Sequence, residues 1–353
     1  MFPQPAFNFL KNNRIAWANV DARGKKSSVT GILIAEPLLP NSTIDGLASA
    51  RKSSVISVGG RFAEIKSGLL PISVIYSYTS SLVYIANISG GGITIVNPIT
   101  LQKQGFIDVI SPFGFAEDRS SRQRLYVCSS LPAGQLIGID PLITHAITTT
   151  TPVDAYPLNA LSYSDYIIVS NFGSGSVSVI SAVNHSLVAS ITGIGQPYVS
   201  VYCPSNGFIY IASRSTGRVF LINPSTWSIH TSILLDGGCI GVAYSSDHNC
   251  IYVTNTDTGT VSVINCSSNS VVGTISIGGR PREIILNPYD GHLYVTNRLF
   301  PYISVINPNT ITVVGTVKIG ATSSGIAYSP SGNSIFATST EIGSVFVIPP
   351  NSF

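Results

Sequence analysis

The sequence is poor in charged side chains and lacks long apolar runs. Only 10% of its 353 residues are Asp, Glu, Lys or Arg, although 44% are hydrophobic. Intrinsic disorder needs the opposite balance, and long exposed helices or coiled coils are rich in Glu, Lys and Arg. No stretch approaches the roughly 18 consecutive apolar residues of a membrane-spanning helix. The abundance of Ser, Thr, Gly, Ile, Val and Tyr instead favours strands and turns.

Most of the net charge lies in the N-terminal part. Residues 1–59 contain seven basic and three acidic residues, a net charge of +4, whereas residues 60–353 contain twelve basic and thirteen acidic residues, a net charge of −1. A neutral body has no general attraction for nucleic acids or acidic membranes. The first residues include Pro3 and Pro5 and no uninterrupted apolar core, so we recognise no secretory signal peptide.

An internal repeat determines the expected fold. Two identical YVTN motifs, Tyr252–Asn255 and Tyr294–Asn297, lie 42 residues apart. Steps of 42 residues in both directions reach related motifs that begin at Tyr84, Tyr126, Ile168, Tyr210 and Phe336. Residues 60–353 number 294, which is seven times 42. Self-similarity at a fixed period of this length is typical of solenoids and propellers.

Each repeat is expected to form four short strands. In the sixth repeat we predict strands at 282–286, 293–296, 303–306 and 312–319, separated by Pro, Asn, Asp and Gly turns. Four-stranded units of about 40–45 residues point to a β-propeller, in which sheets pack around a central channel. The prediction is therefore an all-β, seven-bladed β-propeller at 60–353, with an N-terminal extension at 1–59.

The seventh repeat, which ends at Phe353, contains only three of the expected four strands. Residues 61–67 occupy the phase of an outer strand, because Phe62 to Gly68 aligns with Val272 to Gly278. A strand from the N-terminal side that completes the last sheet would close the ring and remove an exposed sheet edge. We therefore expect this strand to pair next to Val345.

These repeats resemble the YVTN family of β-propellers, which occur in surface-layer and many extracytoplasmic proteins. The resemblance covers residues 60–353 and rests on the two full YVTN motifs and five degenerate ones. It implies the seven-bladed fold and a binding role at a surface, and it transfers no catalytic residue. We accordingly expect an extracellular, cell-surface or particle-associated protein, although fold alone does not assign an activity.

The repeat phase assigns loops to two faces. We define the upper face by the loops that join strands two and three and those that join one blade to the next; the other loops form the lower face. All five histidines map to the lower face: His145, His185, His230, His248 and His292. An upper face without histidine lacks the commonest general base and metal ligand. No catalytic, metal-binding or phosphate-binding motif occurs elsewhere, so we predict no catalytic residue, no metal and no cofactor.

The five cysteines show no metal-binding spacing. Cys250 opens strand two and Cys266 follows strand three of the same blade, so the two are expected roughly opposite each other. A disulfide between Cys250 and Cys266 is one hypothesis, and free buried thiols are the alternative.

The upper face is the best candidate for a binding surface. Five arginines and two aromatic residues map to neighbouring loops there, and such residues are typical of interface hot spots. They are Arg214, Arg218, Arg280, Arg282, Arg298, Phe300 and Tyr302. Asp236, Asp257 and Glu283 share this sector and leave a charge of about +2, less than a nucleic-acid groove needs. The alternative interpretation is that these arginines form salt bridges with the three acids.

The N-terminal extension carries large apolar residues that a closed ring does not need. These are Phe2, Phe7, Phe9, Leu10 and Trp17. They must be buried either against the ring itself or against a partner protein. Within the same extension, 29–35 could form an additional strand and 42–45 a helix start.

Three functions remain open at this stage. The first is a non-enzymatic binding or scaffolding propeller in an assembled surface structure, such as a cell envelope, a spore or appendage layer, or a virion, with adhesion through the upper-face loops as an extension. The second is an upper-face enzyme, a lyase or hydrolase, which predicts a deep pocket at the channel mouth with perturbed pKa values. The third is single-stranded nucleic-acid binding by the arginines and Phe300.

Overall fold

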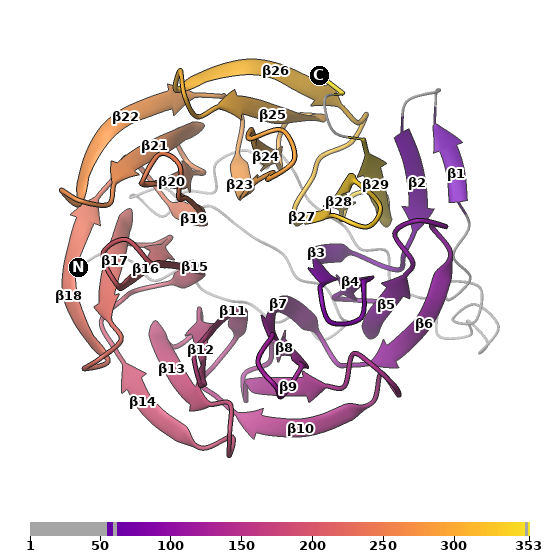
Figure 1. Cartoon of the computed structure of the whole chain (residues 1–353), viewed down its shortest axis with the longest axis horizontal. Coiled ribbons are helices and arrows are strands. Elements are labelled where there is room, and N and C mark those ends of the chain that lie inside the picture. Colours follow the sequence, from indigo (N-terminus) through magenta and orange to yellow (C-terminus); the bar gives the residue numbers. More distant parts are fainter. Residues whose placement is uncertain (1–54, 59–61, 350–351) are drawn as a thin grey trace, which may run out of the picture. The chain divides into compact units, whose positions relative to one another are not determined.

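The computed structural model describes residues 55–58, 62–349 and 352–353, and within these residues every regular element is a β-strand. Seven antiparallel sheets surround a central axis like the blades of a propeller (Figure 1). The described residues contain no helix that is long and apolar enough to span a membrane. The predicted all-β, seven-bladed β-propeller is confirmed.

Strands at the same position in each blade have the same place in the sheet. The innermost strands line the channel: β3 (Pro71–Ser77), β7 (Pro112–Asp118), β11 (Pro157–Tyr163), β15 (Pro197–Cys203), β19 (Cys239–Ser245), β23 (Pro281–Leu286) and β27 (Ile326–Ser329). The second strands are β4 (Leu82–Asn87), β8 (Arg124–Ser129), β12 (Tyr166–Asn171), β16 (Phe208–Ser213), β20 (Cys250–Asn255), β24 (Leu293–Asn297) and β28 (Ser334–Ser339). The third strands are β5 (Gly92–Val96), β9 (Gln135–Ile139), β13 (Ser176–Ser181), β17 (Arg218–Asn223), β21 (Thr260–Asn265), β25 (Tyr302–Asn307) and β29 (Ser344–Ile348). The outer strands are β6 (Lys103–Asp108), β10 (Ile147–Pro152), β14 (Leu187–Ile191), β18 (Ser228–Leu234), β22 (Ser270–Ser276), β26 (Thr312–Lys318) and β2 (Phe62–Lys66).

The ring is closed by a strand that comes from the N-terminal side, as the sequence predicts. Successive innermost strands contact each other around the whole circle, and β27 of blade seven contacts β3 of blade one. β2 forms the outer strand of blade seven, and its Ile65 pairs with Val345 of β29. The first and last described blades are thereby joined by main-chain hydrogen bonds rather than by packing alone.

Blade seven has one strand more than the repeat predicts. β1 (Val55–Val58) pairs antiparallel with β2, so that Val55 lies opposite Ile65. This strand precedes residue 60, where the sequence places the start of the propeller. Its sequence, Val-Ile-Ser-Val, does not alternate between apolar and polar residues and therefore gives no strand signal.

The repeated motif builds the contacts within and between blades. Its aromatic position is fully buried, as Tyr252 illustrates with 1% exposure. Its threonine reaches the innermost strand of the next blade, because Thr254 Oγ1 donates to the carbonyl of Arg282 at 2.7 Å. Its asparagine holds the following hairpin, since Asn255 Nδ2 donates to Thr260 and Ser262 at 2.9 and 2.8 Å. The residues of the repeated motif therefore have structural roles in packing the blades.

The buried core lies between neighbouring blades. Second and third strands are almost wholly buried, whereas outer strands such as β18 and β22 are largely exposed on one face. Five of the seven innermost strands begin with proline, which lacks an amide donor and fits the first residue of a strand. All innermost strands start at the upper face and run toward the lower face, and this direction orders the residues that line the channel.

Candidate functional site

The upper end of the channel holds a buried arginine. Arg282 is the second residue of β23, and its side chain is only 3% exposed. Its Nη2 donates to the hydroxyl of Tyr198, which occupies the same position in β15, two repeats earlier. The guanidinium carbon lies 5.4 Å from the centre of the Tyr198 ring and 5.9 Å from that of Phe113. The buried Nε of Arg282 has no hydrogen-bond partner among the described residues.

A second arginine stands close to the first. Arg298 lies in the loop between β24 and β25. The positive charge of Arg282 and partial desolvation lower the pKa of Arg298 to about 10, and the charges of Arg280 and Arg214 add to the effect. The backbone places Arg298 in the same region, because its amide donates to the carbonyl of Arg280 at 3.0 Å. The structure therefore brings together four of the five arginines that the sequence singles out.

Two of these four arginines share one carboxylate. Arg214 Nη2 and Arg280 Nη2 both lie 3.8 Å from Asp257 Oδ1. These side chains are between one third and one half exposed, so the two ion pairs are screened by water. The salt-bridge interpretation thus applies to Arg214 and Arg280, but not to Arg282.

The remaining candidates of the upper face make other contacts. Arg218 Nη1 donates to Ser232 of the adjacent outer strand at 3.1 Å. Phe300 stacks on Tyr302 with ring centres 5.3 Å apart, and its ring lies against the turn at Gly279. These three side chains support loops of blades four and six around the arginine group.

Glu283 follows Arg282 and faces a cavity of about 200 Å³ in the channel. Its Oε2 accepts the amide of Ile326 in blade seven at 3.2 Å. Desolvation raises the pKa of this carboxyl to about 7, while the charge of Arg282 and the Ile326 amide act in the opposite direction. Most of the cavity lining is apolar, and Phe115 and Val242 are examples. From the sequence alone, Glu283 is merely one of three acids near the arginines.

The lower end of the channel contains charges that sequence reasoning missed. Glu117, near the end of β7, accepts hydrogen bonds from Ser77 Oγ at 2.6 Å and from the amides of Tyr78 and Thr79 at 3.1 and 3.0 Å. Arg119 Nε completes the set at 2.9 Å. Burial opposes ionisation of Glu117, but these donors hold its pKa below the usual range. The carboxylate of Glu117 therefore has four hydrogen-bond donors, one of which is the guanidinium of Arg119.

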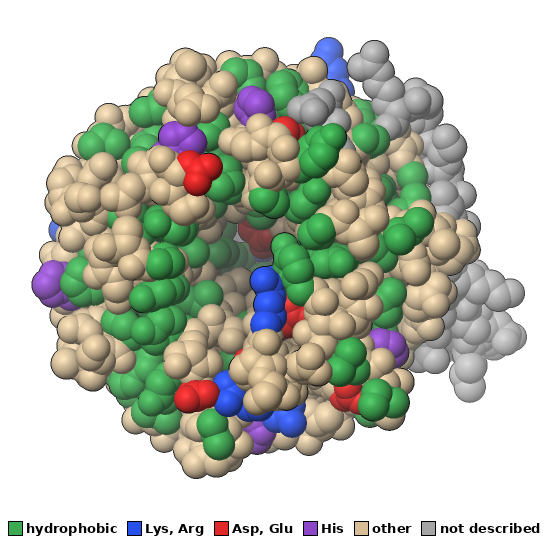
Figure 2. All heavy atoms as spheres, viewed as in Figure 1, with side chains coloured by type: hydrophobic (Ala, Val, Ile, Leu, Met, Phe, Trp, Pro, Cys, Tyr) green, Lys and Arg blue, Asp and Glu red, His purple; other side chains and the backbone are tan. Residues whose placement is uncertain are grey.

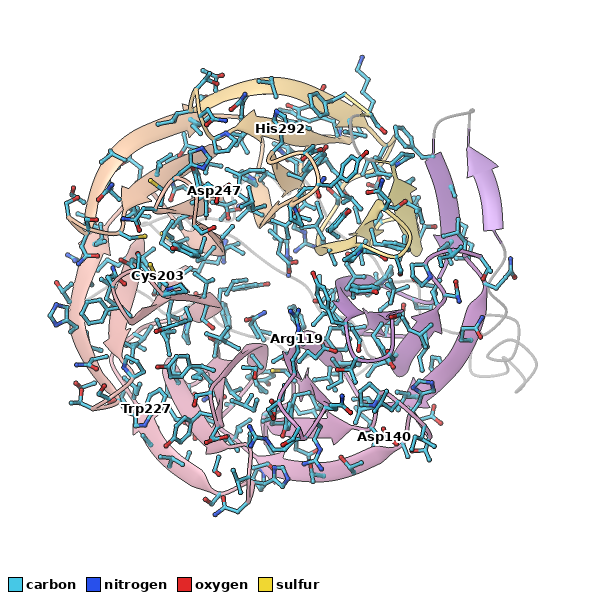
Figure 3. All side chains as sticks on the ribbon, in the orientation of Figure 1. Arg119, Asp140, Cys203, Trp227, Asp247 and His292 are labelled. Carbon is cyan, nitrogen blue, oxygen red and sulfur yellow. The ribbon has the colours of Figure 1, made fainter. Side chains whose placement is uncertain are left out.

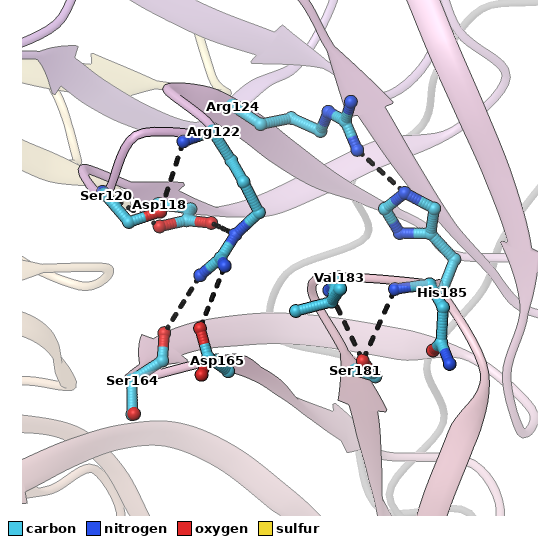
Figure 4. Close-up of polar contacts among 10 residues, drawn as sticks. Asp118, Ser120, Arg122, Arg124, Ser164, Asp165, Ser181, Val183 and His185 are labelled. Atoms are coloured by element: carbon cyan, nitrogen blue, oxygen red, sulfur yellow. Dashed lines mark hydrogen bonds and ion pairs between the residues drawn. The ribbon is translucent and has the colours of Figure 1, made fainter.

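The neighbouring acid is matched in the same way. Arg122 bridges Asp118 of blade two and Asp165 of blade three, at 2.5 and 2.8 Å, and also approaches the carbonyl of Ser164 (Figure 4). Burial opposes ionisation of Asp118, yet Arg122 and Ser120 lower its pKa. Charged residues at four of the positions 117–122 are the signal that could have revealed this cluster in a chain with so few charges.

Arg119 lies at the rim of the central opening. Its guanidinium carbon is 3.6 Å from the centre of the Tyr78 ring. Figure 3 shows Arg119 beside the opening, and Figure 2 shows basic and acidic side chains together at this place on a face that is otherwise mostly apolar and neutral. The hollow beside it, about 480 Å³, is open to solvent and is lined by Glu117, Asp118 and Arg119 together with residues of blade three.

The histidines lie on the lower side, in loops or an outer strand, and two of them, His145 and His185, contact a neighbouring blade. The imidazole of His145 contacts the hydroxyl of Tyr84 at 3.1 Å, and Arg124 Nη1 donates to His185 Nε2 at 2.7 Å (Figure 4). Burial and the charge of Arg124 lower the pKa of His185. Within residues 62–349, no three His, Cys, Asp or Glu side chains converge in a metal-binding arrangement.

The cysteines are free and buried, so the disulfide between Cys250 and Cys266 is not formed. In the ladder of blade five, Cys250 lies opposite Asn265 rather than Cys266. Successive residues of a strand point to opposite faces, so Cys250 and Cys266 enter different hydrophobic clusters. Cys266 instead interacts with Cys203 of blade four, and burial together with this neighbour raises its pKa to about 12.

The predicted docking residues of the N-terminal extension lie outside the described residues. They are Phe2, Phe7, Phe9, Leu10 and Trp17. The strand expected at 29–35 and the helix start at 42–45 lie outside them as well.

Comparisons with known proteins support the fold. No family model matches the chain, and no curated protein matches its sequence. Among solved structures, the chain is similar to hydrazine synthase of Kuenenia stuttgartiensis, with a TM-score of 0.71 and 18% sequence identity. The match covers 80% of this chain and 96% of that one. At this level of identity the similarity shows a common fold and nothing more.

Proposed function

We propose that the chain is a surface-layer-like YVTN-repeat propeller and serves as a non-enzymatic binding module in an assembled surface structure. A partner protein docks on the upper face, at Arg280, Arg282 and Arg298. The observation that carries this proposal is the buried guanidinium of Arg282, whose only hydrogen bond within the described residues goes to Tyr198. A buried cation with no salt bridge among the described residues fits a surface that is completed by a partner.

The division of labour along the repeat supports a binding role. The YVTN motif is used for the scaffold, through Thr254 and Asn255 and their equivalents. The upper loops lie outside this motif. They carry arginines together with Phe300 and Tyr302, and these residue types are common at interface hot spots. In propellers, as in other repeat folds, such loops determine what is bound.

The test is capture of a partner from the native source by the intact protein. The double variant Arg280→Gln with Arg298→Gln is expected to lose the captured partner. The control Lys103→Gln with Arg124→Gln removes the same charge from the lower side, where β6 and β8 begin, and should retain the partner. Equal capture of the partner by both double variants would contradict docking at Arg280, Arg282 and Arg298. Retention on single-stranded nucleic acid that falls steeply with salt would favour the third function instead.

The N-terminal extension is proposed as a second docking element for a protein partner. Deletion of residues 1–52 removes no residue of a described strand, because β1 begins at Val55. Loss of assembly with an intact fold would support docking of Phe2, Phe7, Phe9, Leu10 and Trp17 on a partner. Loss of solubility would show that they pack on the ring.

An enzyme of the channel is the second candidate, because Glu283 has a pKa of about 7 inside a cavity. A carboxyl group that titrates near neutrality is suited to general acid–base catalysis. Among the described residues that line the cavity, none is a His, Cys or Lys that could act with Glu283. A lyase or hydrolase activity of the intact protein that disappears in Glu283→Gln would support this alternative over the binding module.

A further inference from the structure

The surroundings of Arg282 leave several donors unused. Burying a guanidinium is costly, and buried arginines are normally paired with an acid. Here Nη2 donates to Tyr198 Oη, and the buried Nε donates to nothing in residues 62–349. Since Tyr198 Oη accepts from Arg282, its own hydroxyl hydrogen remains available to donate. An incoming oxyanion would find an N–H group and an O–H group side by side.

Aromatic rings hold this arginine in one place. Tyr198 makes edge-on contacts with Phe113 and Phe172, at ring-centre distances of 6.5 and 6.0 Å. Together with Ile240, these rings form a separate apolar cluster at the upper end of the channel. A guanidinium between apolar walls interacts with an anion more strongly than one in water does. The position is therefore preorganised rather than dependent on mobile loops.

Positive charge exceeds negative charge around this position. Asp257 is shared by Arg214 and Arg280, which leaves Arg282 and Arg298 without an ion pair in the described residues. Arg298 lies in the same region, because its amide donates to the carbonyl of Arg280 at 3.0 Å, and the charge of Arg282 lowers the pKa of Arg298. Glu283 points into the next layer of the channel, where the amide of Ile326 donates to it. An anion at the upper mouth would relieve the repulsion.

We propose that the upper end of the channel is a specific oxyanion site in which Arg282, Tyr198 and Arg298 bind one carboxylate or phosphate group. The carboxylate or phosphate is carried by the docking partner, and in this respect the inference rests on the proposed function. Arg282 supplies the buried donors, Tyr198 the hydroxyl donor and Arg298 the charge on the solvent side. Arginine is common at carboxylate and phosphate sites because its planar guanidinium offers several donors in a fixed geometry.

The first experiment measures thermal unfolding of the full chain with sodium acetate or inorganic phosphate against sodium chloride of equal ionic strength. A saturable rise of the unfolding midpoint with acetate or phosphate, but not with chloride, is expected for the intact protein. In Arg282→Met this rise should be absent. Arg218→Met removes an arginine of the same face and should leave the rise unchanged. No saturable rise, or the same rise in Arg282→Met, would overturn the proposal.

A second variant covers the case in which Arg282→Met does not fold. Tyr198→Phe removes one hydroxyl and keeps the ring between its aromatic neighbours. It should weaken the apparent affinity for acetate and phosphate several-fold. An unchanged affinity would contradict the donor role of Tyr198.

The source of the oxyanion is distinguished with short peptides that carry a single acidic group. An amidated peptide with one aspartate, a peptide with only a free C-terminal carboxylate and a phosphoserine peptide are compared by calorimetric titration. The tightest of the three identifies what the partner presents, and binding of none contradicts the site. Partner capture that persists in Arg282→Met would refute the oxyanion site alone. Peptide binding without any partner from the native source would refute the proposed function alone.

Discussion

The two ends of the channel use the same residue types in opposite ways. At the lower end, the carboxylates of Glu117 and Asp118 are buried, and each is matched by an arginine and by further hydrogen bonds. At the upper end, Arg282 is equally buried, and among the described residues its side chain makes one hydrogen bond, to the hydroxyl of Tyr198. The repeat places both in innermost strands, so backbone geometry does not explain the difference. Charges at the lower end hold blades together, whereas the charge at the upper end is left for a ligand.

The largest expected effect is loss of the lower-end network. Glu117→Ala removes the acceptor of four donors, including Arg119, and the loss of these four hydrogen bonds should lower the free energy of unfolding by about 4 kcal/mol at pH 7. Urea unfolding measures the change. Because the folded-state pKa of Glu117 is lowered, its charge stabilises the fold above the unfolded pKa, and this contribution disappears as the pH falls through the folded-state value. Glu341→Ala, an exposed acid that accepts from Thr322, is the control with a small effect. A loss below about 1 kcal/mol would refute the structural role.

Glu283 should show the opposite pH dependence. Its folded-state pKa is raised from 4.5 to about 7, so the fold loses stability as the pH rises through this interval. Glu283→Gln does not titrate and can still accept from Ile326. It should therefore be more stable than the unmodified chain by up to about 3 kcal/mol at pH 8, with no gain near pH 4.5. Thermal unfolding across this range checks the slope, and a pH-independent difference would contradict it.

Removal of the unmatched arginine should stabilise the ligand-free protein. Arg282→Met replaces a buried cation by an apolar side chain of similar length and is expected to raise the free energy of unfolding by about 2 kcal/mol. The sign is opposite to that of Glu117→Ala, which makes the comparison of the two ends decisive. A large loss of stability in Arg282→Met, measured without added oxyanion, would show that Arg282 supports the fold.

The smallest effect concerns the motif itself. Thr254→Val keeps the shape of a buried side chain but removes the hydroxyl that links blade five to the carbonyl of Arg282. The amide of Gly241, which donates to the same hydroxyl, also loses its acceptor. A loss of about 1 kcal/mol is expected in urea unfolding. A similar value for Thr296→Val, which breaks the equivalent link to Ser324, would confirm that the contact is repeated.

The fold could be predicted from the repeat, whereas the candidate site depends on residues that are not repeated. A large apolar or aromatic residue recurs at the position of Tyr252 in every blade, so seven weak signals add up. Even the closing strand at Phe62 follows from its phase in the repeat. Arg282 occurs in one blade only. Its face and loop region could be inferred, but not that it is buried beside Tyr198, because that contact joins residues 84 positions apart. Likewise, the ion pair between Arg122 of blade two and Asp165 of blade three depends on side-chain directions that the repeat does not specify.

The way the ring closes also sets an order for biosynthesis. β2 leaves the ribosome early, but its partner β29 lies about 280 residues later, as the hydrogen bond between Ser344 and Glu64 illustrates. Until β29 is synthesised, β2 cannot pair with its neighbour in blade seven, and the incomplete ring has two blades without a neighbour on one side. Exposed strand edges invite pairing with other nascent chains. We therefore expect molecules that are stalled or truncated before residue 344 to aggregate rather than to persist as six-bladed fragments.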